Sequence, residues 1–304
     1  MFKKYTHKNI TWIDVEAPTK NYIQTIVNDY PIHPLVANEL LSPTLRPRID
    51  LYDTVVYLIL HFPTVVHSHS EKTEQEIDFI VGKDFILTAH YEAVDSLVEL
   101  AKRFEVDAML QKEDIGNHAG FLFFYILQHL YMDVAQDLES IGNSLHKIEK
   151  AIFSGREHEM VYEISRVSRE LLDFKQAIRL HQEVLDSFDP AGKKLFGEEF
   201  SYYIHAISGE YYRIAATLES NIDVLAELRA ANNSLLNTKT NDIMKILTIM
   251  AFVTFPLVLL TSLFGMNTAY LPIVGKPNDF WIIIGMMMTI AFVLFAIFKF
   301  KKWL

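Results

Sequence analysis

The residues best suited to chemistry are Gly265, Met266 and Asn267, because they close a run of 19 uncharged residues, Ile246 to Phe264. An Asn carboxamide oxygen can accept hydrogen bonds from the waters of a hydrated cation without stripping them. A ring of carboxylates would bind the ion more tightly and release it more slowly, which is poor for conduction. Asn267 is therefore a candidate for contact with a hydrated cation.

Two uncharged runs predict the elements that hold this entrance. A helix needs about 20 apolar residues to cross a bilayer. Residues 246–264 supply one span and residues 280–298 a second, and the loop 265–279 joins them. The pattern predicts a two-helix transmembrane hairpin at the C-terminal end of the chain.

One face of the first span is polar at both ends and apolar in the middle. Steps of three and four residues follow one side of a helix, and they give Asn241, Met244, Thr248, Ala251, Phe255, Val258 and Ser262. Rings of Met244, Phe255 and Val258 could block a pore by dewetting. Because neither span carries a charge, one hairpin cannot enclose a polar path. We expect the path to lie between identical copies in a closed ring.

The chain resembles the CorA family of divalent-cation channels in two features. One is the tripeptide at the end of the first span, and the other is the membrane-entry segment Asn241-Asp242-Ile243-Met244-Lys245-Ile246-Leu247-Thr248. The resemblance covers the whole chain in layout and is closest from Asn241 onward. It implies a homopentamer. It also implies that Gly265, Met266 and Asn267 form the selectivity entrance, and that Asn241 closes the cytoplasmic end with Met244 and Leu247 nearby.

Three positions depart from the family pattern. Val258 stands where many members carry Thr, and Leu271-Pro272-Ile273-Val274 lacks the acidic residue of the usual loop, for which Asp279 is a candidate replacement. Ala206 falls where the family places a stalk carboxylate of its regulatory metal site. Cytosolic gating is therefore absent or uses other residues, such as Glu210.

The rest of the chain predicts an α+β domain and a long stalk. Residues 1–115 read as an α/β domain, with strands near 10–15, 55–62, 76–81 and 85–90 and a hairpin turn at 82–84. Residues 116–197 read as a helical hairpin with a turn at Pro190. Residues 198–264 lack a convincing stop and predict a single helix of roughly 100 Å. Such a rod, with apolar residues at near-heptad spacing, favours an oligomer.

The charge distribution indicates the orientation. Residues 1–240 contain 23 Lys and Arg against 36 Asp and Glu, whereas residues 241–304 contain 5 against 2. The acidic part does not fit nucleic acid, whose binding needs Lys and Arg; it fits cation attraction or simple solubility. Lys239, Lys245 and the basic tail 299–304 flank the spans, which places both termini in the cytoplasm of a cell-membrane protein surrounded by lipid.

Three functions remain open at this stage. The first is passive, potential-driven Mg²⁺ uptake, with Co²⁺ or Ni²⁺ as further ions. The second is proton-coupled Zn²⁺ transport, as in ZntB-type relatives, and the third is a membrane-anchored scaffold. No enzyme or cofactor is expected, because no acid–base pair, nucleophile set or phosphate loop is recognisable. His67 with His69, and His205 with Glu210, could hold a metal, but a polar hairpin tip and a solvated helix face are favoured for them.

Overall fold

The computed structural model describes residues 2–44, 46–64, 74–110, 118–268, 271–275 and 277–301, without the side chains of 106–110. His67 and His69, and part of the predicted basic tail, lie outside the described residues. The chain divides into two compact units, Met1–Arg229 and Ala230–Leu304. Each unit is described by itself below.

A mixed six-stranded sheet forms the centre of the first unit. Its strands are β1 (Phe2–His7), β2 (Ile10–Glu16), β3 (Arg48–Leu51), β4 (Val56–Pro63), β5 (Glu74–Val81) and β6 (Phe85–His90), in the spatial order β1-β2-β6-β5-β4-β3. Only the β2–β6 pair is parallel among these neighbours. The predicted turn after β5 is confirmed, since the Gly82 N–H donates to the Phe85 carbonyl at 2.9 Å.

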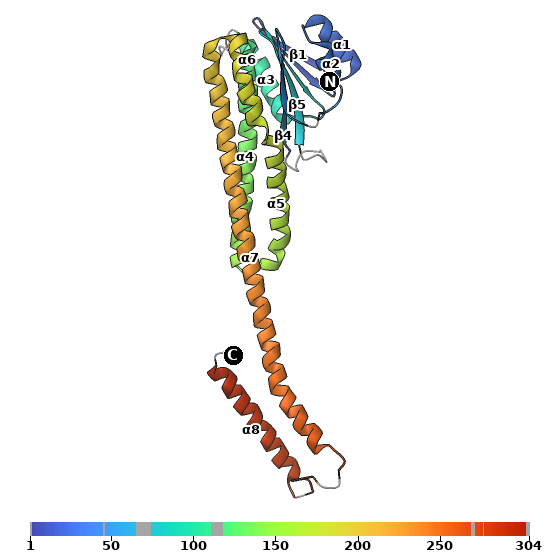
Figure 1. Cartoon of the computed structure of the whole chain (residues 1–304), viewed down its shortest axis with the longest axis vertical. Coiled ribbons are helices and arrows are strands. Elements are labelled where there is room, and N and C mark those ends of the chain that lie inside the picture. The colour runs from blue at the N-terminus through green and yellow to red at the C-terminus, as the bar shows by residue number, and fades with distance from the viewer. Residues whose placement is uncertain are drawn as a thin grey trace. The chain divides into compact units, whose positions relative to one another are not determined.

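Helices cover both faces of the sheet (Figure 1). On one face, α1 (Lys20–Asp29) and α2 (Pro34–Glu39) pack Ile23, Ile26 and Val36 into a core with sheet residues such as Ile59 and Leu87. On the other face lie α3 (Asp95–Leu110) and α4 (Ala119–Phe153); Phe104 of α3 meets Trp12 edge-on, and Phe123 of α4 meets Phe79 in the same way. The inner strands β4, β5 and β6 are therefore largely buried on both sides, which explains the nearly continuous apolar run of β4.

The Trp12-Ile13-Asp14 segment of β2 is a core feature. The Trp12 indole N–H donates to Thr88 Oγ1 at 2.9 Å, and the Thr88 hydroxyl donates to Asp14 Oδ1 at 2.7 Å. His90 Nε2 lies 3.2 Å from the same oxygen. The pKa of His90 is raised, because its hydrogen bond to Asp14 and the Asp14 charge outweigh burial. These hydrogen bonds link β2 to β6 and give the buried Asp14 carboxylate its partners.

The region 116–197 contains three helices and not the predicted hairpin of two. They are α4, α5 (Glu157–Ile178) and α6 (His181–Phe196), because the helix that begins at Glu157 breaks near residue 180. The prediction of a turn at Pro190 was wrong, since Pro190 lies inside α6. Buried Phe188 and Ala191 flank it, and packing of this face outweighs the missing backbone donor. The helix ends at Gly197, whose φ of 97° favours glycine.

The strands β1 and β3 and the helix α2 were not predicted. Strand β1 alternates partly exposed and exposed residues along the sheet edge, so it lacks the apolar run that marks β4. Helix α2 has only six residues. Elements this short carry too few positions for a periodic signal.

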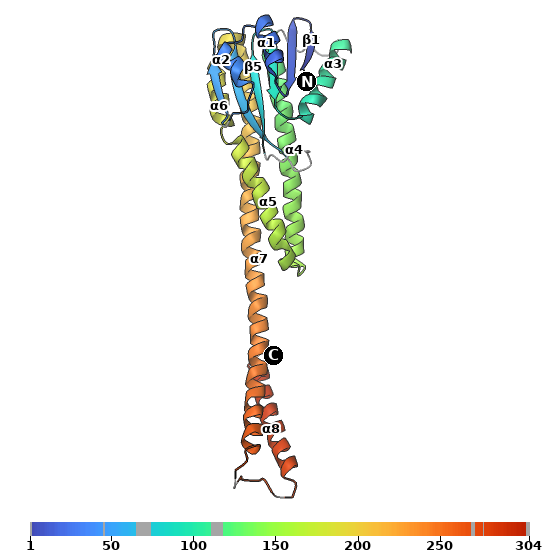
Figure 2. The same cartoon turned by 90° about the vertical axis from the view of Figure 1, so that its right-hand side faces the viewer.

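The second unit contains the rest of α7 (Ser201–Phe264), which begins in the first unit after a short helix, Glu198–Phe200, and all of α8 (Asp279–Phe300). Both helices are long and apolar enough to cross a membrane. Figures 1 and 2 show α8 turning back antiparallel to the end of α7. The predicted order of α+β domain, long helix and two apolar helices is confirmed.

Candidate ion pathway

The predicted pore residues form one exposed line along α7. Asn241, Met244, Thr248, Ala251, Phe255, Val258 and Ser262 are all exposed in the single chain. At about 1.5 Å per residue the line extends for roughly 30 Å, the thickness of a bilayer's hydrocarbon core. Leu247 is also exposed and lies beside the line. Within one chain these side chains follow a single helix face, so they cannot surround an ion.

A different face of α7 is the less exposed one. Ile249 is buried, and partly buried residues follow it at helical spacing: Val253, Pro256, Leu257, Leu260 and Phe264. On α8, buried Phe298 and partly buried Ile290 and Leu294 share one face in the same way. The line from Asn241 to Ser262 lies on another side of α7 from this less exposed face.

Oxygen atoms are available at both ends of the line. The side chains of Asn241, Ser262 and Asn267 make no hydrogen bond within the described part of the chain, and Asn267 is exposed. The Thr248 hydroxyl donates to the Met244 carbonyl at 2.7 Å, which leaves its oxygen free to accept. Carboxamide and hydroxyl oxygens of this kind can bind the waters of a cation.

Gly265 fits its place for a geometric reason. Helix α7 ends at Phe264, and the Gly265 N–H still donates to the Thr261 carbonyl at 2.9 Å. A Cβ added at residue 265 would lie only 2.9 Å from that carbonyl oxygen. The chain leaves the helix tightly here, and Met266 and Asn267 follow at the exit. A larger residue would shift the backbone that positions the Asn267 carboxamide.

Asp279 has a structural role that the sequence did not reveal. It is the first residue of α8, where acidic side chains favour the positive end of the helix dipole. Its Oδ2 accepts from the Gly275 N–H at 3.0 Å and its Oδ1 from the Phe280 N–H at 2.7 Å. The carboxylate therefore fixes the loop to α8, whatever it also contributes to the electric field at the mouth.

The soluble unit shows no preformed regulatory metal site in its described residues. Ala206 is exposed on α7, Glu210 pairs with Arg213, and His205 Nδ1 lies 2.8 Å from the Ser201 carbonyl oxygen. His205 and Glu210 thus use separate partners and do not converge. No three His, Asp or Glu side chains gather for a metal within the described ranges.

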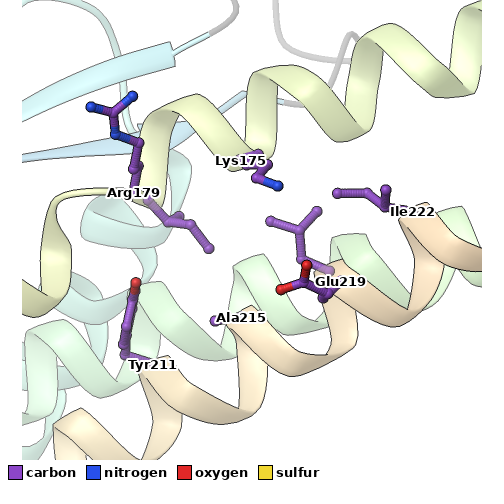
Figure 3. Close-up of a pocket in the computed structure, with 8 residues that line it drawn as sticks. Lys175, Arg179, Tyr211, Ala215, Glu219 and Ile222 are labelled. Carbon is purple, nitrogen blue, oxygen red and sulfur yellow. The ribbon is translucent and has the colours of Figure 1, made fainter.

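A groove between α5 and α7 in the soluble unit was missed by sequence reasoning. Its volume is about 170 Å³, and its lining residues are Lys175, Ile178, Arg179, Tyr211, Ala215, Leu218, Glu219 and Ile222. Figure 3 shows Lys175 on one wall and the Glu219 carboxylate on the other. Its two cations and single carboxylate do not make a cation site, so we leave it outside the pathway.

Comparisons with known proteins agree with this layout. The cobalt/magnesium transport protein CorA of Thermotoga maritima is 25% identical over 295 residues, which are 97% of this chain and 83% of that protein. The complete structure of the CorA magnesium transporter from Methanocaldococcus jannaschii superposes with a TM-score of 0.85 at 20% identity, covering 99% of this chain and 93% of that one.

A solved ZntB cytoplasmic domain from Vibrio parahaemolyticus shares the fold of the soluble part, with a TM-score of 0.62 at 14% identity over 76% of this chain and 89% of that chain. The family described as CorA-like Mg²⁺ transporter protein matches residues 7–302, which includes the predicted pore line, the tripeptide and both apolar helices. This chain is a membrane protein and belongs to the family of CorA-like Mg²⁺ transporter proteins.

Proposed function

We propose that this protein is a passive channel that lets Mg²⁺ enter the cell, with Co²⁺ and Ni²⁺ as further permeant ions. The observation that carries the proposal is the family match over residues 7–302, which contains the whole predicted pathway. A relative whose name includes both cobalt and magnesium transport supports the same ions.

The conducting unit is a ring of identical chains. Residues 246–264 and 280–298 contain no charged side chain, so a single hairpin has nothing with which to solvate an ion. A ring brings copies of the exposed line on α7 around a common axis, with each chain adding one carboxamide at Asn267. Closed cyclic symmetry is the usual arrangement of identical subunits, and resemblance to the family makes the ring a pentamer.

Polar and apolar residues of the line have different roles in the proposed pore. Asn267 and Asn241 accept hydrogen bonds from the hydrated ion at the two ends, while Thr248 and Ser262 offer further oxygens. Met244, Phe255 and Val258 form the apolar stretch, where a narrow pore would empty of water and stop the ion. The gate is therefore a hydrophobic one, and widening of the ring opens it.

The driving force is the membrane potential. Moving one charge across 100 mV releases about 2.3 kcal/mol, and a divalent ion gains about twice that. Lys239, Lys245 and Lys299 flank the membrane spans, which favours a cytoplasmic soluble unit and a short outer loop. The acidic soluble unit then faces the cytosol.

Zinc transport coupled to protons is the second candidate. Two observations favour it: Ala206 stands where a stalk carboxylate is expected, and residues 271–274 contain no acidic side chain. Without these groups, gating by cytosolic Mg²⁺ would need other residues.

The deciding experiment measures ion flux into proteoliposomes that contain the full-length protein. Mg²⁺ and Zn²⁺ are compared under an imposed potential and under an imposed pH gradient. The Asn267→Ala variant removes one carboxamide per subunit and should lower Mg²⁺ flux by about tenfold or more, because a lost hydrogen bond to a charged species is worth about 1.5–3 kcal/mol. The matched control is Thr268→Ala, which removes a neighbouring exposed hydroxyl.

Potential-driven Mg²⁺ flux that falls in Asn267→Ala and persists in Thr268→Ala would support the channel. Zn²⁺ flux that requires the proton gradient would establish the second candidate instead. If neither ion crosses in reconstituted protein of verified oligomeric state, the hairpin only anchors a scaffold and the proposal fails.

A further inference from the structure

Two acidic side chains of β5 are buried in the soluble unit. Glu76 is 8% exposed and Asp78 is fully buried. Residues two apart on a strand point to the same face, and the register sets His61 opposite Glu76 and Ile59 opposite Asp78. On the other side of Asp78 the register sets Ala89 of β6. Asp78 therefore has no cationic side chain as a cross-strand neighbour.

The two carboxyl groups have unequal surroundings. Glu76 accepts from the Thr44 N–H at 2.6 Å and from the Thr44 hydroxyl at 3.0 Å. Asp78 Oδ2 accepts one long bond from the Tyr91 hydroxyl at 3.4 Å. Asp78 Oδ1 is buried and has no hydrogen-bond partner among the described atoms. A bare buried carboxylate oxygen is costly, so this atom requires an explanation.

A proton on Asp78 Oδ1 supplies the explanation. The protonated oxygen becomes a donor, and the neighbouring Glu76 carboxylate is an acceptor. The pKa of Asp78 is raised well above its usual range, first by burial and then by the charge of Glu76. Two ionised carboxyl groups this close, in a site without solvent, would repel strongly.

We propose that Asp78 binds a proton that it shares with Glu76, and that this shared proton is a pH-sensitive latch. The latch holds the segment after α2, because Glu76 anchors Thr44 through two hydrogen bonds. Loss of the proton creates a second buried negative charge beside Glu76, pushes the carboxylates apart and loosens Thr44. The latch belongs to the soluble unit and does not depend on which ion crosses the membrane.

Other charged groups lie around the pair. They are His61 on β4, Arg48 on β3, Glu39 on α2, Glu74 on β5 and Asp173 on α5. Arg48 pairs with Glu39 and Asp50. His61 lies 3.5 Å from Glu74 Oε1 through Nδ1 and 3.6 Å from Glu76 Oε2 through Nε2, so it is a rival for the proton. Tyr57 on β4 also acts on Asp78, and its buried hydroxyl has no hydrogen-bond partner among the described atoms, so it is a rival donor to Asp78.

Infrared difference spectroscopy of the full-length protein tests the proton directly. At neutral pH we expect the carbonyl stretch of a protonated, buried carboxylic acid, and we expect Asp78→Asn to abolish it. The control Glu74→Gln removes a nearby, partly exposed carboxylate and should keep the band. A wild-type spectrum without this band at neutral pH would overturn the proposal.

Hydrogen exchange provides the second readout. In the wild type, the Thr44 amide should lose protection as pH rises, beyond the intrinsic increase of exchange with pH. In Asp78→Asn the side-chain N–H donates to Glu76 at every pH, so that loss should vanish. If His61→Gln removes the loss and Asp78→Asn keeps it, the proton belongs to His61 and the latch is wrong.

Discussion

The two units of this chain differ in which side chains they bury and which they expose. The soluble unit buries polar groups and gives most of them partners: His181 is fully buried, with hydrogen bonds on both ring nitrogens. The membrane unit exposes large apolar groups, such as Phe255 at 72% and Phe292 at 74%. One unit completes its core within a single chain. The other leaves its apolar surface uncovered within a single chain, and in the proposed ring lipid and further copies would cover it.

Changes in one unit should therefore leave the property of the other unaltered. Substitutions in the soluble core should change the free energy of unfolding, and substitutions on the exposed line of α7 should change ion flux. An effect that crosses between the units would break this comparison.

The largest expected effect is on acid stability through His181. Burial lowers the pKa of His181 to about 3. Its Nε2 lies 2.8 Å from the His61 carbonyl oxygen and its Nδ1 2.9 Å from the Tyr131 hydroxyl, so the neutral ring donates to His61 and accepts from Tyr131. An unfolded His binds its proton near pH 6.5, so stability is complete above that value. We expect a loss of as much as about 4 kcal/mol as pH falls from about 6.5 to 3.

The measurement is chemical unfolding of the full-length protein in detergent as a function of pH. His181→Phe keeps a ring but leaves two buried groups without partners, so it should be about 1–3 kcal/mol less stable at neutral pH. It should also lose the part of the acid dependence due to His181. His146→Phe, on an exposed side chain, is the control and should follow the wild-type curve. Equal pH curves for all three proteins would contradict the prediction.

An effect of intermediate size is expected at Gly265. Gly265→Ala places a Cβ 2.9 Å from the Thr261 carbonyl oxygen, which forces the helix exit to move. A strain of about 1–3 kcal/mol at a functional backbone position should lower Mg²⁺ flux by about tenfold without changing the unfolding of the soluble unit. Gly285→Ala on α8 is a matched control, because an added Cβ there meets nothing within 4 Å beyond its own stretch of helix backbone. Equal Mg²⁺ flux in the two variants would contradict the proposed role of Gly265 in the selectivity entrance.

The smallest expected effect is at Val258. Val258→Thr adds a hydroxyl ring to the apolar middle of the proposed pore and should favour its hydration. We expect Mg²⁺ flux to rise by a few-fold, since one hydrogen bond contributes about 0.5–1.5 kcal/mol. Val253→Thr makes the same change on the less exposed face of α7 and should leave flux nearly unchanged. A rise in both variants, or in Val253→Thr alone, would place the pathway on another face.

Long, strongly patterned segments were predictable from the sequence. The two uncharged runs correspond to the end of α7 and to α8, and α7 ends at Phe264 as expected. Strands β4, β5 and β6 were also expected, because β4 is rich in β-branched and aromatic residues and the turn at 82–84 separates β5 from β6. The break after Ile178 and the helical Pro190 were not, since packing of buried residues overrode the local signals.

The candidate pathway also has features that the sequence predicts and features that only the folded structure shows. Its residue types and spacing came from the sequence, because 3.6 residues per turn fixes which side chains share a helix face. The close approach at Gly265 and the two hydrogen bonds of Asp279 could not be predicted from the sequence, because loop geometry has no periodic pattern.

The sequence alone determined the membrane spans, the family resemblance and the line of residues from Asn241 to Asn267, since each depends on order and spacing along the chain. Only the tertiary structure decided that Asp78 and Glu76 share a buried site with Thr44 and Tyr91, and that His181 lies between Tyr131 and His61. The physical reason is that burial and hydrogen bonding depend on residues distant in sequence, which only the folded chain brings into contact.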